Sequence, residues 1–266
     1  MILGKKTQYP HSYAPETLFS INRSEARAKI NFSDEIPFHG IDIWNGWELT
    51  WLDKNKKPLI GIISIRIDAH SPQIIESKSL KLYLGSFAMT QYKSKADLET
   101  TIKKDIEKAI QYPVKTAIHI GANESKGKIR KLPGKCIDNL NIECNFRKVD
   151  PKLLSYNSEI ITERIHSHLF RSLCPVTNQP DIGSIILSYE GRSIDHDSLL
   201  KYIISYRQHN DFHEACVERI FMDIKNICRP SKLTVFALFN RRGGIDINPF
   251  RSDYEKAPND FRTWRQ

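Results

Sequence analysis

Cys174 is the residue whose surroundings in the sequence best suit a nucleophile. It ends a strand-like run and opens a loop rich in proline and asparagine, and Asp181 follows seven positions later. Catalytic groups often lie on loops that a rigid sheet positions, and a thiol beside a proline is poorly explained as core packing. Because a free thiol is mostly protonated at neutral pH, a nucleophilic Cys174 needs a cationic neighbour or a proton acceptor. The alternative is a buried, unreactive cysteine.

A second candidate lies where an apolar strand-like run passes into a helix. Glu76, Lys78 and Lys81 fall at the start of that helix. The first N–H groups of a helix lack partners within it and lie at the positive end of its dipole, so they bind anions well. Lysines are not favoured at this end by the dipole. The misfit suggests a phosphate site, and a solvated, charged first turn is the alternative.

A third candidate is the start of a later helix. Asp211 and Glu214 have the spacing of a capping box, which is a structural role. His213 has no such explanation. Together, His213 and Glu214 offer acceptors to a polar ring, because a carboxylate accepts two parallel N–H bonds well.

A fourth candidate combines cations with backbone freedom. Arg241 and Arg242 precede Gly243 and Gly244. Guanidinium groups bind phosphate, and glycines let the backbone approach a ligand closely. The alternative is a hairpin turn with solvated arginines, because Gly-Gly between strands is a common turn sequence.

The elements that must position these residues occur in the same order twice. In both halves the apolar pattern predicts two strands, two helices and two more strands. The first half has strands at 47–52 and 60–67, helices at 78–89 and 96–110, and strands at 116–120 and 140–149. The second has strands at 159–173 and 182–189, helices at 199–206 and 212–227, and strands at 232–239 and 245–250. This order predicts an α+β fold in which each half is a four-stranded antiparallel sheet with two helices on one face.

The expected organisation is an N-terminal extension and two modules. Residues 1–35 are polar and are expected to extend or wrap rather than to fold alone, followed by modules at 36–150 and 151–266. The 266 residues carry 40 Lys and Arg against 31 Asp and Glu, a net charge of +9 that suits either nucleic acid or an anionic cofactor. With 40% hydrophobic residues and neither a long apolar run nor a secretory segment, a globular cytoplasmic protein is predicted. The five cysteines lack Cys-x-x-Cys spacing, so a disulfide framework or a Cys-rich zinc site has no support.

Taken together, the four candidate segments resemble one enzyme family, the 7-cyano-7-deazaguanine reductases, which are the nitrile reductases known as QueF. The resemblance rests on four ordered blocks: Glu-Ser-Lys-Ser-Leu-Lys-Leu-Tyr (76–83), Leu-Cys-Pro-Val-Thr-Asn-Gln-Pro-Asp (173–181), Phe-His-Glu (212–214) and Arg-Arg-Gly-Gly-Ile-Asp-Ile-Asn-Pro (241–249). It spans nearly the whole chain and looks like the two-module form of the family.

This resemblance implies a tandem tunnelling fold (T-fold), a homodimer and a reaction. The nitrile 7-cyano-7-deazaguanine and two NADPH give the amine 7-aminomethyl-7-deazaguanine, in the pathway to queuosine in tRNA. The family needs no metal, and its substrate is a free deazapurine rather than tRNA.

The resemblance also implies roles for individual residues. Cys174 would attack the nitrile carbon to give a covalent thioimide, and Asp181 would deliver a proton to the nitrogen. The residues implied to hold the deazaguanine are Ile75, Glu76, Ser77, His213 and Glu214. Those implied to hold NADPH are Ser77, Lys78, Arg242 and Gly243.

Two other functions fit the same sequence less well. One is a pterin- or purine-processing enzyme of the GTP cyclohydrolase type, whose zinc-dependent members need a Cys/His ligand set that is not evident here. The other is a non-catalytic RNA-binding protein, suggested by the charge of +9. Its basic residues are interspersed with acidic ones, and no aromatic RNA-binding motif is present.

Overall fold

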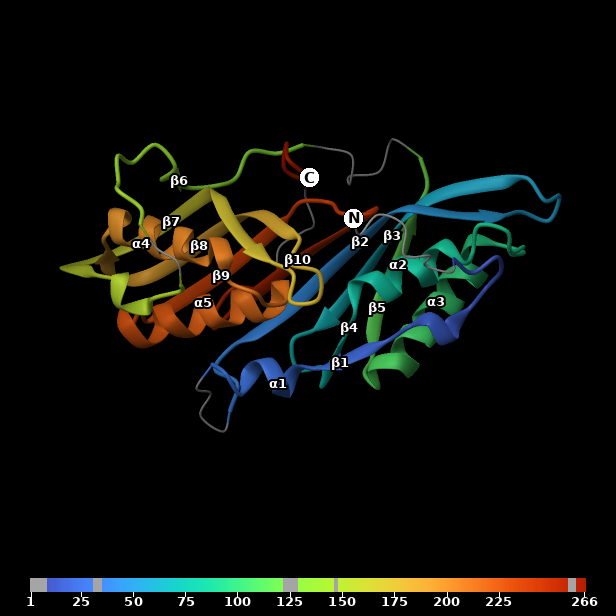
Figure 1. The fold of residues 1–266 in the computed structure, drawn as a ribbon, viewed down its shortest axis with the longest axis horizontal. Coiled ribbons are helices and arrows are strands. Elements are labelled where there is room, and N and C mark those ends of the chain that lie inside the picture. The colour runs from blue at the N-terminus through green and yellow to red at the C-terminus, as the bar shows by residue number, and fades with distance from the viewer. Residues whose placement is uncertain (1–8, 31–34, 122–128, 146–147, 258–261) are drawn as a thin grey trace.

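Alternating apolar side chains build one large sheet in this computed structural model, which describes residues 9–30, 35–121, 129–145, 148–257 and 262–266 (Figure 1). Within these residues the sheet has eight strands. In spatial order they are β5 (Val114–His119), β3 (Pro58–Asp68), β2 (His39–Leu52), β10 (Ile245–Ser252), β9 (Lys232–Phe239), β8 (Pro180–Ile194), β7 (Tyr156–Leu173) and β6 (Lys135–Cys136). All neighbours are antiparallel except β6 and β7.

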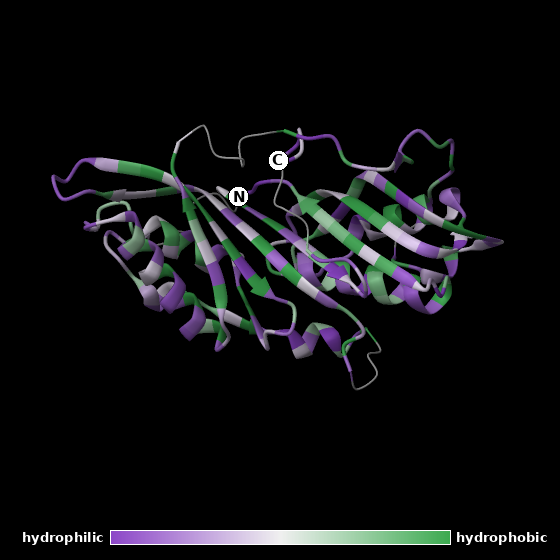
Figure 2. Cartoon of the chain, turned by 180° about the vertical axis from the view of Figure 1, so that it is seen from behind, coloured by the Kyte–Doolittle hydropathy of each residue, from purple (hydrophilic) through white to green (hydrophobic). Residues whose placement is uncertain are grey.

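Four helices cover one face of this sheet: α2 (Ser77–Gly85), α3 (Lys95–Ile110), α4 (His196–Ser205) and α5 (His213–Ile227). They lie in front of the strands in Figure 1 and behind them in Figure 2. Strand β9 shows how the sequence sets the two faces. Val235 and Phe239 join the core under α4 and α5, whereas Phe236 and Leu238 join a smaller cluster on the opposite face. None of the described helices combines the length and apolar character needed to span a membrane.

The two halves of the chain meet where β2 pairs with β10. Residues 39–46 of β2 align with residues 245–252 of β10 in a continuous antiparallel register. One core lies under α4 and α5 and the other under α2 and α3, and the latter also takes in Ile245 and Ile247 of β10. The fold is therefore mixed α+β, and its eight-stranded sheet runs across both halves.

Short elements complete the described part of the chain. They are η1 (Pro15–Thr17), β1 (Ser20–Asn22), α1 (Arg23–Arg27), β4 (Gln73–Ile75), η3 (Pro151–Leu153) and η4 (Tyr206–Gln208). Strands β1 and β4 form a separate two-stranded antiparallel sheet, with Ser20 opposite Ile75. The N-terminal segment thus lies against the strand that leads into α2.

One expected strand is wrong, and with it the four-stranded sheet of the first half. The described part of 140–149 (140–145 and 148–149) has no strand, so the first half contributes β2, β3 and β5 together with the two-residue β6. The apolar side chains of Leu140, Ile142 and Val149 pack instead against the core under α4 and α5. Alternation records burial of one side, and it does not ensure that a sheet edge is available for pairing. The four predicted helices are present, although the first ends at Gly85 rather than at 89.

Candidate active site

The loop that carries Cys174 joins β7 to β8 and is closed by its own backbone. The Cys174 N–H donates to the Gln179 carbonyl at 2.9 Å, and the Asn178 N–H donates to the Cys174 carbonyl at 3.0 Å. Asn178 has a φ of 56°, in the left-handed region that asparagine tolerates better than most residues. These bonds fix the thiol relative to the sheet.

A backbone bridge brings the start of α5 beside this loop. The Leu173 N–H donates to the His209 carbonyl at 2.8 Å, and the Asp211 N–H donates to the Leu173 carbonyl at 3.1 Å. Because α5 begins at His213, its first turn is held close to Cys174. Two of the four candidate segments are therefore joined by main-chain hydrogen bonds.

The capping box expected at this helix is wrong. The N-cap of α5 is Phe212, and the Asp211 carboxylate accepts a hydrogen bond from the Phe212 N–H at 2.9 Å. Asp211 therefore lies one residue too early for the box. Oε1 of Glu214 is buried without a hydrogen-bond partner among the described residues. This carboxylate oxygen is available to a ligand.

Cys174 is 7% exposed, and its thiol lies near hydrogen-bond donors. Burial by itself raises the pKa of the thiol. Hydrogen bonds from the Thr177 hydroxyl, from the N–H groups of Val176 and Thr177, and from the Arg242 guanidinium outweigh burial, so the pKa is lowered overall. A lower pKa enlarges the fraction of thiolate, the form that attacks an electrophile.

Asp181 is paired with the same guanidinium group. Arg242 Nη1 is 2.7 Å from Asp181 Oδ1, and His213 Nε2 is 3.7 Å from that oxygen. Burial raises the pKa of Asp181, and the positive charges of Arg242 and Lys81 only partly oppose this. A carboxyl group with a raised pKa keeps its proton more readily, which suits a proton donor.

His213 is neutral in this site. Burial, together with the positive charges of Arg242 and Lys81, lowers the pKa of His213 to about 3. Its ring packs edge-on against Phe239 with 4.0 Å between ring centroids. A neutral imidazole donates at one nitrogen and accepts at the other, so it can form hydrogen bonds with a polar ring without adding charge to the site.

The segment with two glycines is a hairpin turn, and it also lets the Lys81 side chain approach the backbone closely. Gly243 and Gly244 have φ values of 57° and 77°, as a tight turn between β9 and β10 requires. A Cβ atom on Gly243 would lie 3.1 Å from Lys81 Nζ. The missing side chain lets Lys81 lie against the turn, beside Arg242.

A small cavity, called here the Asp181 cavity, collects these groups. Its lining comes from α2, α5 and the β8 and β9–β10 ends: Ser77, Lys81, Asp181, His213, Asn240, Arg242, Ile245 and Ile247. Four of the residues implied by the family resemblance, Ser77, Asp181, His213 and Arg242, thus share one cavity. Lys81 belongs with them. The sequence suggested it for a phosphate site, whereas the family resemblance gave it no role.

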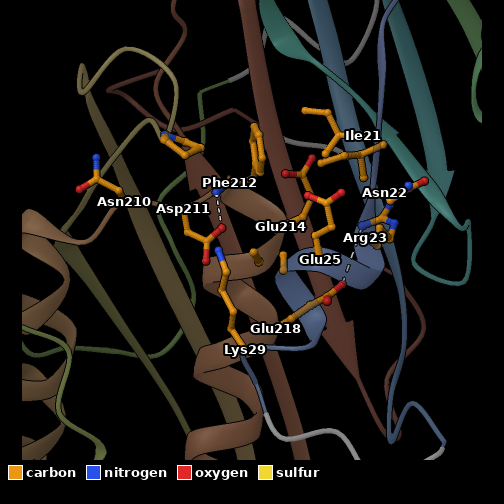
Figure 3. Close-up of a pocket in the computed structure, with 14 residues that line it drawn as sticks. Ile21, Asn22, Arg23, Glu25, Lys29, Asn210, Asp211, Phe212, Glu214 and Glu218 are labelled. Atoms are coloured by element: carbon orange, nitrogen blue, oxygen red, sulfur yellow. Dashed lines mark hydrogen bonds and ion pairs between the residues drawn. The ribbon is translucent and has the colours of Figure 1, made fainter.

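A larger cavity, called here the Glu214 cavity, borders the β7–β8 loop and the start of α5 (Figure 3). It holds about 560 Å³ of space, partly open to solvent. Pro175, Phe212 and Glu214 form one side, and Ile21 and Arg23 of the N-terminal segment form another. Burial raises the pKa of Glu214 to about 8, the negative charge of Asp42 adds to this, and Arg23 opposes it.

Glu76 has a structural role in this conformation. Its carboxylate accepts hydrogen bonds from the N–H groups of Lys78 at 2.9 Å and Ser79 at 2.7 Å, so it caps α2. These are the N–H groups that the sequence left open for a phosphate. Lys78 is exposed and lines neither cavity, and the Ile75 side chain is buried in the core. Ile75 can therefore reach a ligand only through its backbone.

Buried ion pairs surround the Glu214 cavity. Arg23 contacts Asp42 at 2.5 Å, and Arg251 contacts Asp42 at 2.8 Å and Glu218 at 2.9 Å. Arg27 contacts Glu218 at 2.8 Å. These pairs fasten α1 to α5 and to the β2–β10 seam. The sequence gave no signal for them, because the partners are far apart along the chain.

Comparison with known protein families supports the resemblance. The family model QueF_N, described as "Nitrile reductase, 7-cyano-7-deazaguanine-reductase N-term", matches residues 9–118. The model QueF, described as "QueF-like protein", matches residues 180–258. The chain belongs to the QueF family. The QueF matches include Glu76, Asp181, His213 and Arg242, whereas Cys174 lies between the two matched segments.

One solved structure is similar to part of this QueF chain. It is described as "Crystal structure of the archaeosine synthase QueF-Like in the apo form". The sequence identity is 16%, the TM-score is 0.32, and the match covers 38% of this chain and 99% of that chain.

Proposed function

We propose that this protein reduces the nitrile 7-cyano-7-deazaguanine to the amine 7-aminomethyl-7-deazaguanine with two NADPH, in the synthesis of queuosine in tRNA. The observation that carries the proposal is the shared guanidinium group of Arg242. It contacts Asp181 at 2.7 Å and is among the groups that lower the pKa of the Cys174 thiol, in a chain of the QueF family. One cation thereby acts on both the proposed nucleophile and the proposed acid, and the acid lines the Asp181 cavity.

The first step is addition of sulfur to the nitrile. The Cys174 thiolate forms a bond to the nitrile carbon, one π bond of the triple bond breaks, and Asp181 gives its proton to the nitrogen. The product is a thioimide, which accepts hydride better than the nitrile does. Without the proton, the nitrogen would carry an unstabilised negative charge.

When bound, NADPH would supply one hydride to the thioimide carbon and, once the Cys174 thiol had left, a second to the resulting imine. Lys81 and Arg242 suit an anionic dinucleotide, because both cations crowd at one cavity with Asp181. Burial and, after it, the charge of Arg242 lower the pKa of Lys81, so an anion bound here would favour its charged form. Ser77 and the backbone of Gly243 lie beside these cations.

The polar edge of the base is proposed to meet carboxylates. Glu214 and Glu76 would accept N–H groups of the deazaguanine, and neutral His213 would bind another polar atom of the ring. Because the pKa of Glu214 is raised to about 8, binding of the N–H groups would favour loss of its proton. A base without those donors would leave a buried carboxylate unpaired, which is costly. For Glu76 this requires that its carboxylate leave, or share, the two N–H groups that it caps.

The same proposal extends to organisation. We expect a cytoplasmic homodimer of two-module chains, divided as 1–35, 36–150 and 151–266, that acts on the free base without binding tRNA. Sedimentation equilibrium would test the homodimer, and a tRNA-binding measurement in low salt would test the absence of tRNA binding.

The decisive experiment is mass spectrometry of the protein mixed with the nitrile in the absence of NADPH. We expect one added nitrile mass on the peptide containing Cys174, and none in Cys174→Ala. Added NADPH should then lose absorbance, two equivalents per nitrile. An unmodified Cys174 would overturn the mechanism, and an adduct without NADPH oxidation would overturn the reductase proposal.

A further inference from the structure

The Glu214 cavity contains a donor and an acceptor that the ion pairs around it do not use. Oε1 of Glu214 and Nε of Arg23 are both buried, and neither has a hydrogen-bond partner among the described residues. The two residues are 3% and 4% exposed. An unpaired buried donor or acceptor costs about 1–3 kcal/mol, so such a pair lining one cavity indicates a ligand that satisfies both.

The rest of the Arg23 side chain is already engaged. Its Nη2 lies 2.5 Å from Asp42 and its Nη1 lies 3.8 Å from Glu218. Strand β1 precedes it and pairs with β4, and the Phe19 carbonyl accepts a hydrogen bond from the Glu76 N–H at 2.8 Å. The N-terminal segment is therefore fixed on one side to β4 and Glu76, and on the other side to α5. Figure 3 shows Arg23 and Glu214 on facing sides of the cavity.

We propose that Arg23 is a specificity residue for the base, and that its Nε–H donates to the ring carbonyl of a 2-amino-6-oxo purine-like ligand whose adjacent N–H groups bind Glu214. This inference rests on the proposed function and adds to it a recognition group outside the four sequence blocks that carry the resemblance. The edge of such a base presents two N–H donors beside one carbonyl acceptor. The cavity presents the complementary acceptor and donor from two separate parts of the chain.

The test compares two ligands in two proteins. The ligands are 7-cyano-7-deazaguanine and its 6-thioxo analogue, which keeps every N–H group but has a weaker acceptor. Binding is measured by calorimetry in Cys174→Ala, with Arg23 unchanged or changed to Lys, because lysine keeps the charge opposite Asp42. With Arg23, we expect the oxo base to bind about tenfold to a hundredfold more tightly than the thioxo base. With Arg23→Lys, that preference should disappear.

Arg27→Lys is the matched control. Arg27 shares Glu218 with Arg23 but does not line the cavity, so the oxo preference should persist. An oxo preference that is equal in Arg23→Lys and in the unchanged protein would overturn the inference. If Arg23→Lys does not fold, a crystal structure of Cys174→Ala with the bound base tests whether Arg23 contacts the ring carbonyl. We expect 2.7–3.2 Å between Arg23 Nε and the carbonyl oxygen, and a distance beyond about 3.5 Å would overturn it.

The two proposals fail separately. A thioimide adduct on Cys174 with no dependence of binding on Arg23 would remove only this inference. The lack of any adduct would remove the proposed function, whatever Arg23 does.

Discussion

Arg242 lies between the two groups that the proposed chemistry needs. One guanidinium group pairs with Asp181 at 2.7 Å and helps to lower the pKa of the Cys174 thiol. A positive charge favours the thiolate and, through the same field, disfavours a protonated carboxyl group. The acid keeps a raised pKa because burial outweighs the cations, whereas the thiol has a lowered pKa because its hydrogen bonds outweigh burial. The two residues are tuned in opposite directions within one site.

Arg242→Gln should therefore shift the pH profile of thiol reactivity. With one stabilising donor lost, the pKa of Cys174 rises, and alkylation of its peptide by iodoacetamide should require higher pH. The rate below neutral pH should fall several-fold. The profile is measured by mass spectrometry of that peptide, since Cys136 and Cys144 are exposed and also react. Arg241→Gln is the control, because Arg241 lies over Trp47 instead, 4.1 Å from the ring centroid. An unchanged profile in Arg242→Gln would refute the role of the guanidinium.

At the scale of elements, the start of α2 combines a structural cap with the proposed base-binding carboxylate. Glu76 accepts two N–H bonds of its own helix, so a substitution there changes folding as well as binding. Strand β1 adds to this by pairing with β4 immediately before the cap. A loss of activity in a Glu76 variant is thus ambiguous unless stability is measured too.

Two substitutions at Glu76 separate these effects. Glu76→Ala removes the cap and should lower the free energy of unfolding by about 1 kcal/mol. Glu76→Asn replaces it with a good N-cap residue and should keep most of that stability. If Glu76 also binds the base, both variants lose affinity for the nitrile. Urea unfolding and calorimetric titration are the measurements, and full affinity in Glu76→Asn would confine Glu76 to capping.

At the scale of the whole molecule, the β2–β10 seam makes the two halves depend on each other. The register joins residues 39–46 to 245–252, and buried Arg251 of β10 pairs with Asp42 of β2 at 2.8 Å. The Asp181 cavity likewise takes Ser77 from one half and Arg242 from the other. We expect one cooperative thermal transition by calorimetry, with calorimetric and van't Hoff enthalpies in agreement. Two resolved transitions would contradict this coupling.

The sequence alone determined what depends on near neighbours along the chain. Side-chain periodicity located the four long helices and most strands, and the ordered motifs around Glu76, Cys174 and Arg242 predicted the family. The prediction of a strand at 140–149 was wrong, because alternation of apolar residues indicates burial and does not show whether a sheet edge is free to pair. The prediction of a capping box was wrong, because the spacing of Asp211 and Glu214 does not show that α5 begins after Phe212.

Only the tertiary structure decided which distant groups meet. The pairing of β2 with β10 joins residues about two hundred positions apart, and the contacts of Arg23 with Asp42 and of Arg242 with Asp181 follow from the way the sheet is assembled. Such contacts depend on strand order and on the entropy cost of closing long loops, neither of which a local pattern records. The chemistry was therefore visible in the residue types, while the cavity that brings it together exists only in the folded chain.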